Sequence, residues 1–289
     1  MTRFWPVLKV LLGAGLLAAL VIRLGSDAFV EAVRAINVVA VLAALGIGLL
    51  TTVFSAWRWC LVARGLGLQL RLPTAVADCY RALFLNSVLP AGVLGDVHRA
   101  VSHGKQEGDV RRGVRAVALE RSAGLVVLVV VAVGVLLTQP ALRSAAGGDL
   151  LPWLLAVLAV VVAVAVLVVR RSVLRTGLAG GVWLGVTLLS LAALAGYLAL
   201  FVVAARAAGS QAPLGELLPL LVLALLAMGL PINIGGWGPR EAVSTVAFGA
   251  VGYGATQGLT VAVVYGTLSL IACLPGLAML LRTSSVARC

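Results

Sequence analysis

Charged residues are scarce in this chain, and their scarcity excludes most soluble folds. Only 11% of the 289 residues are Asp, Glu, Lys or Arg, whereas soluble domains carry roughly 25%. No polar stretch is long enough to bury a hydrophobic core of its own. Instead, 62% of the residues are hydrophobic, and several apolar runs approach the ~20 residues that a membrane-spanning helix needs. The composition therefore predicts an all-α, polytopic membrane protein in which residues 1–289 form a single integral membrane domain.

Lysine, paired cysteines and enzyme motifs are also lacking. Lys9 and Lys105 are the only lysines, so arginine carries almost all of the net charge of +12. In an apolar chain, such arginines are typical of cytoplasmic loops rather than of a nucleic-acid-binding surface. The four cysteines have no paired spacing, and His98 and His103 do not share a helix face, which argues against disulfides and a metal site. HExxH, GxSxG, DxD and Walker patterns are absent. We therefore expect a non-enzyme that needs no metal or cofactor and binds no nucleic acid.

Apolar runs and the arginines between them predict the helices and their orientation. We expect about seven or eight transmembrane helices, with spans near 7–22, 38–59, 116–137, 151–169, 182–205, 214–230 and 259–281 and a short helix over 239–249. A signal peptide would resemble the first span, but no small-residue cleavage site follows it. Arginine-rich loops at 99–121 and 170–175 predict a cytoplasmic N-terminus for a multi-pass protein of the cell (inner or plasma) membrane. Charge alone leaves the side of the C-terminus open.

Two local arrangements are predicted near the end of the second span. Trp57, Arg58 and Trp59 are expected at the level of the lipid headgroups, where indole rings are half wet and an arginine can reach water. A binding role for Arg58 is the alternative. Asp78 and Arg81 lie three residues apart, so they are expected to pair on one helix face.

Residues 86–99, NSVLPAGVLGDVHR, interrupt a hydrophobic run with proline and glycine. The helix before this segment is too short to cross a membrane comfortably, and basic residues flank the region on both sides, so we expect a re-entrant hairpin. Irregular backbone at membrane depth is tolerated only inside protein or beside a water-filled cavity. Asp96 is predicted to cap a helix that begins at Val97. Free N–H groups at that helix start, together with Arg99, would form an anion site.

A second interruption, LPINIGGWGPRE at residues 230–241, has the same design. Gly238 is predicted to cap a helix whose first residue is Pro239, and Arg240 lies in its first turn. In both segments the arginine follows the proline by nine residues. Corresponding broken segments in two halves are typical of transporter sites built from internal repeats. We therefore expect two repeat halves, 1–140 and 150–289.

A phosphate-bearing lipid is the membrane anion that these two helix starts would suit, because arginine grips phosphate oxygens through a planar fork. The alternative is a pair of ordinary kinks with arginines that reach for water, in which the two asparagines only stabilise the breaks. Glu120 could be a gate, a partner of Arg99, or half of a surface ion pair with Arg121. Glu241 could balance Arg240 or carry a coupling proton. The candidate binding residues are Asn86, Gly92, Gly95, Asp96, Arg99, Glu120, Arg121, Asn233, Gly235, Gly236, Arg240 and Glu241.

Several of these residues form a pattern that resembles a known family. The pattern comprises Trp57-Arg58-Trp59, the broken helix from Phe84 to Arg99, the Glu120-Arg121 pair with Gly124, and the late elements Gly235-Gly236 and Arg240-Glu241. Together they resemble the integral membrane domain of lysylphosphatidylglycerol synthases and their stand-alone, flippase-like relatives. The similarity covers nearly the whole chain. Glu120 stands where the family usually has aspartate, and the first turn lacks the family's adjacent glycines.

The resemblance implies a lipid flippase that moves a phosphate-bearing lipid or lipid-linked precursor between leaflets. The family's soluble aminoacyl-transfer domain is absent, so lysine transfer is not expected. One alternative is a non-catalytic membrane partner of a lipid-modifying or glycan-assembly enzyme. Another is a lipid-phosphate transferase that uses Asp96 as a base. The expected partners are an anionic lipid or polyprenyl-phosphate-linked substrate and the membrane itself, with a homo-oligomer or a lipid-modifying enzyme as the protein partners left open.

Overall fold

The computed structural model describes residues 30, 34–88, 93–138, 163, 166–167, 180–229 and 237–286, and side chains only as far as 281 at the C-terminal end. Most of these residues are helical. The predicted span 7–22 and nearly all of the span 151–169 lie outside the described residues. So do four candidate binding residues, namely Gly92, Asn233, Gly235 and Gly236.

Long and short helices follow one another in the same order in two regions of the chain. In the N-terminal region, a long helix, two short helices and another long helix succeed one another: α3 (Val38–Gly65), α4 (Leu72–Val88), α5 (Leu94–Gln106) and α6 (Val110–Thr138). The C-terminal region repeats this order with α9 (Gly180–Ala207), α10 (Leu214–Met228), α11 (Pro239–Ala250) and α12 (Ala255–Cys273), and α13 (Pro275–Val286) follows. The division of the chain into repeat halves itself stays a prediction.

Four helical stretches among the described residues are long and apolar enough to cross a membrane. They are α3, α6, α9 and the run of α12 into α13, each 27 to 29 residues long. At 1.5 Å per residue, such helices exceed the ~30 Å of a bilayer's hydrocarbon core. The chain is therefore a helical membrane protein, as the composition predicts.

The short helices form two pairs whose members are too short to span. Helices α4 and α5 have 17 and 13 residues, and α10 and α11 have 15 and 12. Even the longest measures only about 25 Å at the usual rise per residue. The predicted sixth span, 214–230, is thus the short helix α10, and α11 closely matches the predicted helix over 239–249.

Helices α3 and α6 extend beyond the predicted spans, because polar residues continue each helix past its apolar portion. Helix α3 continues past residue 59 to Gly65, and α6 begins at Val110 rather than at 116. Arginine is a good helix former, so basic residues at helix ends continue the helix although they interrupt the hydrophobic run. The predicted pair of Asp78 and Arg81 is confirmed, with 2.6 Å between Oδ1 and Nη1.

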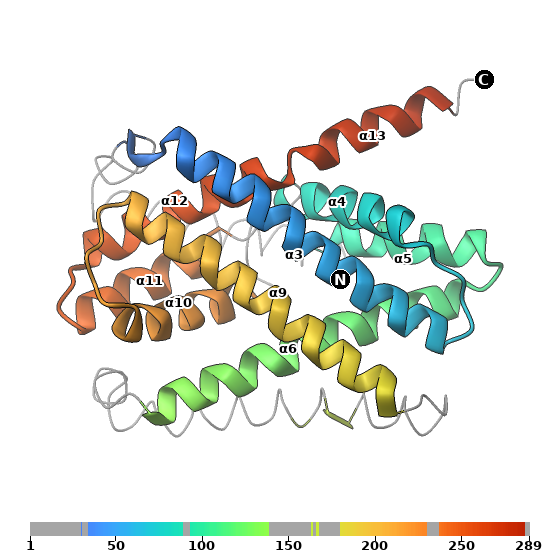
Figure 1. Cartoon of the computed structure of the whole chain (residues 1–289), viewed down its shortest axis with the longest axis horizontal. Helices are drawn as coiled ribbons and strands as arrows, with labels where there is room; N and C mark the ends of the chain where they lie inside the picture. Colours follow the sequence, from blue (N-terminus) through green and yellow to red (C-terminus); the bar gives the residue numbers. More distant parts are fainter. Residues whose placement is uncertain are drawn as a thin grey trace, which may run out of the picture.

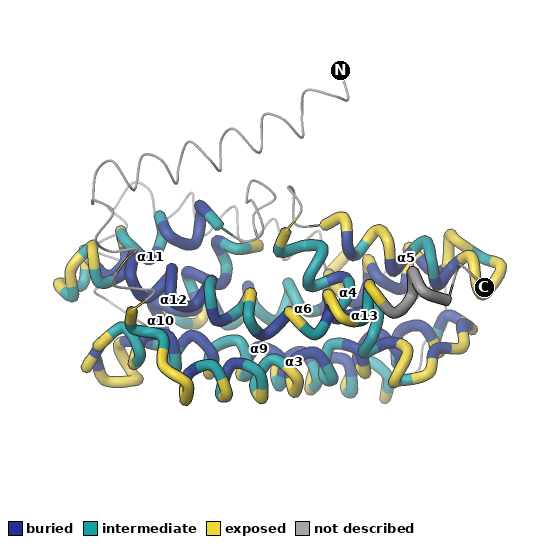
Figure 2. The backbone as a smooth tube through the Cα atoms, turned by 90° about the horizontal axis from the view of Figure 1, so that it is seen from above, coloured by how far each residue is buried: buried dark blue, intermediate teal, exposed yellow. Residues whose placement is uncertain are grey.

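Helices α3 and α9 lie side by side and antiparallel. Gly196 abuts Thr51, while Gly185, earlier in α9, abuts Leu61, later in α3. A Cβ on Gly196 would lie 2.5 Å from Thr51 Cγ2, so the missing side chain allows the close approach. Figure 1 shows the two helices crossing in front of the others, with α10–α12 on one side and α4 and α5 on the other. Seen from above, they form one layer with an exposed outer face (Figure 2).

Two buried apolar clusters hold the bundle together. One draws most of its members from α9, α10 and α12, and in it the rings of Phe201 and Tyr265 stack with centroids 4.0 Å apart. The other joins α3 to α4, α5 and α6 around Trp59, whose side chain is fully buried. Buried polar groups contact both clusters, since the guanidinium of Arg99 lies over the ring of Trp59 and that of Arg240 over the ring of Tyr265.

Candidate functional site

Glu120 of α6 bridges two buried arginines from other helices. Its Oε1 accepts a hydrogen bond from Arg58 Nε of α3 at 2.9 Å, and its Oε2 accepts one from Arg99 Nη2 of α5 at 2.6 Å. All three side chains are almost fully buried. Charge-assisted hydrogen bonds of this kind are about twice as strong as neutral ones. Glu120 was considered as a gate, as a partner of Arg99, or as half of a surface pair with Arg121. The structure shows that it is a partner of Arg99, and that Arg58 is a second partner.

The prediction that Trp57, Arg58 and Trp59 form a headgroup anchor is wrong for two of the three residues. Trp57 is exposed, but Trp59 is fully buried and Arg58 is 7% exposed. Arg58 also donates from Nη1 to Ser190 Oγ of α9 at 3.0 Å. Gly124 makes room for this guanidinium, because a Cβ there would lie 2.8 Å from Nη1. Glu120 draws the arginine inward, since a buried carboxylate without a partner would be costly.

Arg99 is enclosed on every side by protein groups. Besides Glu120, its Nε donates to Asp96 Oδ1 at 2.8 Å, and its guanidinium lies 4.8 Å from the ring centre of Trp59. Only 3% of the side chain is accessible. Arg99 therefore binds its neighbouring helices, and it lines neither of the two cavities described below.

The prediction that Asp96 caps a helix starting at Val97 is wrong. Helix α5 begins at Leu94 with Val93 as the N-cap, and Asp96 lies within its first turn. The carboxylate instead accepts hydrogen bonds from Arg99, from Arg121 of α6 and from the amide of Asn86. Two guanidinium groups attract a carboxylate more strongly than free backbone N–H groups do, so distant partners override the local cap signal.

Asn86 stabilises the broken segment from the end of α4. Its Oδ1 accepts from the backbone N–H of Gly95 at 2.8 Å, and its Nδ2 donates to Asp96 Oδ2 at 3.1 Å. Gly95 is pressed against α4, since a Cβ there would lie 2.2 Å from the carbonyl oxygen of Ala82. Both residues thus fix the approach of α4 and α5, which is one of the two roles considered for the asparagine.

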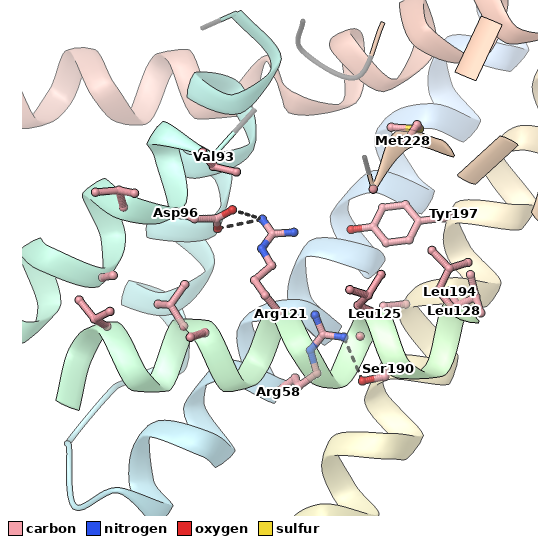
Figure 3. Close-up of a pocket in the computed structure, with 18 residues that line it drawn as sticks. Arg58, Val93, Asp96, Arg121, Leu125, Leu128, Ser190, Leu194, Tyr197 and Met228 are labelled. Atoms are coloured by element: carbon pink, nitrogen blue, oxygen red, sulfur yellow. Dashed lines mark hydrogen bonds and ion pairs between the residues drawn. The ribbon is translucent and has the colours of Figure 1, made fainter. Parts of the chain in front are cut away.

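Arg121 is not paired with Glu120, its neighbour in sequence. Its Nη2 lies 2.7 Å from Asp96 Oδ2, and 47% of its side chain is accessible although it lies inside the bundle. The other donors of its guanidinium have no partner among the described residues. Figure 3 shows Arg121 rising from α6 between Asp96 and Tyr197. Among Arg58, Arg99 and Arg121, it is the arginine whose side chain is accessible.

Two adjoining cavities explain why Arg121 is accessible. The first has a volume of about 630 Å³, and its polar lining residues are Arg58, Asp96, Arg121, Ser190 and Tyr197. The second measures about 300 Å³, and its polar lining residues include Asn86, Ser87, Arg121, Arg240 and Ser269. The residues that line both are Arg121, Leu128, Leu194, Tyr197, Met228 and Gly229. Arg121 is thus the charged group at the boundary of the two cavities.

Arg240 lies on the wall of the second cavity, in the first turn of α11. Its Nε donates to Glu241 Oε1 at 2.9 Å, and its guanidinium lies 4.9 Å from the ring centre of Trp237 and 5.2 Å from that of Tyr265. Glu241 balances the charge of Arg240, which was one of the two roles predicted for this residue. The helix start is confirmed: Gly238, with φ at 105°, is the N-cap, and Pro239 follows. The backbone N–H of Gly238 donates to Glu241 Oε2 at 2.6 Å.

Sequence reasoning missed several residues of the two cavities. Ser190, Tyr197, Tyr265 and Ser269 lie in apolar spans that are read only as scaffold. A signal was present, because polar groups in spanning helices are rare and mark functional paths. Ser190 and Tyr197 are seven residues apart, two helical turns, and so share one face of α9. Among the described residues, no group of three or more His, Cys, Asp or Glu is placed to hold a metal ion.

His103, near the end of α5, is expected to make the stability of the protein depend on pH. Burial against Trp59 lowers the pKa of its imidazole, although Glu107 and Asp78 oppose the shift. In the unfolded chain the imidazole has its ordinary pKa of about 6.5, so near and below this pH the unfolded state binds a proton more readily than the folded state does. We expect the free energy of unfolding to fall as the pH drops through this value. Thermal unfolding in detergent at pH 7.5 and 5.5 should show a smaller decrease for His103→Phe than for the wild type, and an equal decrease would contradict the assignment.

Comparison with known proteins agrees with the resemblance seen in the sequence. Residues 7–276 match the model of the family described as "Lysylphosphatidylglycerol synthase TM region". The match covers nearly the whole chain, including both short-helix pairs and all of the described cavity residues. No curated protein matches the chain.

Proposed function

The chain belongs to the lysylphosphatidylglycerol synthase TM region family, and from this we propose that it moves a phosphate-bearing lipid between the leaflets of a bacterial inner membrane. The observation that carries the proposal is the place of Arg121. This arginine lies inside the bundle, is half accessible, and stands where the two cavities adjoin. Family membership alone indicates a membrane protein related to lipid handling, and the cavities supply the remaining argument.

Arg121 belongs to α6, one of the described helices that are long and apolar enough to span a membrane. An arginine within the membrane costs roughly 2.5–3.5 kcal/mol on insertion scales, so Arg121 would not be retained at a cavity wall without a partner. Asp96 satisfies one end of the guanidinium. The remaining donors suit phosphate oxygens, which accept two parallel N–H bonds from a planar guanidinium. A lipid phosphate is the anion that a membrane cavity meets.

Arg240 lies on the wall of the second cavity, but only 1% of its side chain is accessible and Glu241 balances its charge. We therefore assign the phosphate contact to Arg121 and give Arg240 a supporting place in the wall. Arg99, the arginine of the first predicted anion site, is enclosed by Glu120, Asp96 and Trp59. We assign Arg99 to supporting Asp96 and Glu120 instead.

The linings also suit the rest of a lipid. Aliphatic side chains make up much of the first cavity: Val93, Val97, Val114, Val117, Leu125 and Leu128. Ligand sites of this kind are mostly apolar with a few placed polar groups. The proposal needs no covalent chemistry, because a lipid that crosses between leaflets leaves with the bonds it brought.

Translocation of an acyl-labelled anionic phospholipid in proteoliposomes tests this function. We expect Arg121→Gln to slow translocation at least about tenfold, since a lost charge-assisted contact is worth about 1.5–3 kcal/mol. Its melting temperature in detergent should remain near that of the wild type, because Arg121 is half accessible.

Arg112→Gln is the matched control. Arg112 lies on the same helix in an exposed pair with Asp109 and lines neither cavity, so this variant should retain the wild-type rate. Full translocation by Arg121→Gln would remove the proposed role of the cavities.

A further inference from the structure

One end of the molecule carries a concentration of exposed cations. The turn between α3 and α4 lies beside the turn between α5 and α6, because the backbone N–H of Gln69 donates to Glu107 Oε2 at 3.1 Å. Figure 1 shows α5 at the opposite end of the molecule from α11. The basic residues around these two turns, which we call the basic end, are all exposed: Arg64, Arg71, Lys105, Arg111, Arg112 and Arg115.

Carboxylates balance only a small part of the basic end. Within residues 64–71 and 105–115 the acidic residues are Glu107 and Asp109, so six cations leave a net charge of +4. Both carboxylates already have partners, since Glu107 accepts the bond from Gln69, and Asp109 pairs with Arg112 at 3.1 Å. The other five cations form no ion pair with a described residue. Their charge is therefore open to an external anion.

The helix arrangement itself does not require these cations. The C-terminal region has the same order of helices, yet its matching stretches, 206–216 and 250–257, contain only Arg206 and Glu216 as charged residues. Those two charges cancel. In addition, Arg111 and Arg115 lie four residues apart on α6, where like charges disfavour a helix. The charge of the basic end thus needs a reason other than helix packing.

Exposed aliphatic side chains accompany the cations. On α6, Val110 and Val114 are 38% and 46% exposed, and on α5 Val97 is 54% exposed. Because Val110 and Val114 are one turn apart, they form a row beside the row of Arg111 and Arg115. Apolar and basic rows side by side are typical of helices at a membrane surface, with the cations level with the lipid headgroups. An acidic soluble partner would not need the valines, so the pattern favours a lipid surface.

We infer that the basic end is a binding surface for the anionic headgroups of the lipid leaflet around it. The bound lipid lies beside the protein, with its phosphate at the cations and its acyl chains in the bilayer along Val110 and Val114. Basic residues next to spanning helices attract anionic lipids, and several cations act together. None of the six basic residues lines either cavity. This surface is therefore separate from the cavities, and it binds lipid whether or not the protein transports any.

Electron paramagnetic resonance of spin-labelled lipids tests the inference. Phosphatidylglycerol and phosphatidylcholine with the same acyl label are compared in phosphatidylcholine vesicles that contain the wild-type protein, and the motionally restricted fraction measures association with the protein. We expect phosphatidylglycerol to associate at least about threefold more strongly than phosphatidylcholine at low salt. This ratio should fall towards one in about 0.5 M salt, because exposed charges are screened. Equal association of the two lipids at low salt would overturn the inference.

A triple substitution assigns the preference to the basic end. Lys105→Gln, Arg111→Gln and Arg115→Gln together lower its net charge from +4 to +1, so most of the preference for phosphatidylglycerol should disappear. The melting temperature should stay near that of the wild type, because the three positions are exposed and glutamine is a good helix former. Asp109→Asn combined with Arg112→Gln is the matched control. It removes one charge of each sign from the same surface, and it should keep the wild-type ratio.

Arg121→Gln separates this surface from the cavities. Arg121 lines both cavities and is not part of the basic end, so the preference for phosphatidylglycerol should persist in this variant. Loss of the preference in Arg121→Gln, or its survival in the folded triple variant, would show that the lipid is held elsewhere and would overturn the inference. If the triple variant does not fold, the wild-type salt dependence and Arg121→Gln decide. Translocation does not enter these measurements, so a failure of the proposed function leaves their outcome unaffected.

Discussion

Replacing Glu120 with glutamine is expected to destabilise the fold more than any other single polar substitution described here. The change removes one negative charge and leaves Arg58 and Arg99 buried with only Asp96 nearby. Breaking a buried pair by removing one partner typically costs about 3–5 kcal/mol. Here one carboxylate serves two arginines from different helices, so α3, α5 and α6 lose their common contact. We expect Glu120→Gln to lower the melting temperature sharply and to reduce the folded fraction after size-exclusion chromatography.

Asp109→Asn is the control for this substitution. It removes a carboxylate from an exposed pair with Arg112, which is worth at most about 1 kcal/mol. The double variant Glu120→Gln with Arg58→Gln should recover some of the lost stability, because it removes one of the two uncompensated charges. A melting temperature of Glu120→Gln within about a degree of the wild type would show that the bridge does not hold the helices.

Gly266→Val is expected to slow translocation by disrupting the second cavity. A Cβ at this position of α12 would lie 2.3 Å from Arg240 Nη2 and 2.8 Å from the Trp237 ring. Either Arg240 leaves its pair with Glu241 or Trp237 leaves its stacked position, and the branched side chain fills space at the cavity wall. Loss of a charge-assisted contact is worth about 1.5–3 kcal/mol, and the valine also occupies part of the cavity, so we expect the translocation rate to fall at least about tenfold.

The liposome assay and a melting curve together check this prediction. Gly134→Val places the same side chain on α6, where nothing lies within 4 Å of the added Cβ, and it should retain both stability and rate. Gly266→Val should keep a folded chromatographic profile, because the second cavity offers space for a small displacement. Translocation at the wild-type rate by folded Gly266→Val would argue against any role for Arg240 in transport.

Local signals in the sequence predicted the ends of several helices. Gly238 and Pro239 begin α11 as expected, because a glycine cap and a first-turn proline act through their own backbone. The fifth predicted span, 182–205, closely matches α9. Apolar runs indicate the part of a helix that is apolar enough to span a membrane, whereas arginines at the helix ends conceal how far the helix continues, as α3 and α6 show.

Long-range pairing could not be predicted from the same signals. Arg58 and Glu120 are 62 residues apart, and Arg58 and Ser190 are 132 apart. A single sequence does not show which polar residues of different helices meet, so the local pattern favoured an anchor for Arg58 and a cap for Asp96. Arg121 was a candidate in the sequence, but its separation from Glu120 and its place between two cavities depend on how α5, α6 and α9 pack.

The contact between Asp96 and Arg121 has a kinetic consequence for a carrier. A phosphate that reaches Arg121 does not meet a bare cation, because it must share the guanidinium with a carboxylate already in contact with it. The phosphate is then held by the remaining donors beside a carboxylate of like charge, so its net affinity is lower than it would be at an unpaired guanidinium. Low affinity shortens the residence time of the cargo, since affinity differences appear mostly in the dissociation rate. The same carboxylate that moderates capture therefore hastens release, which favours turnover over retention.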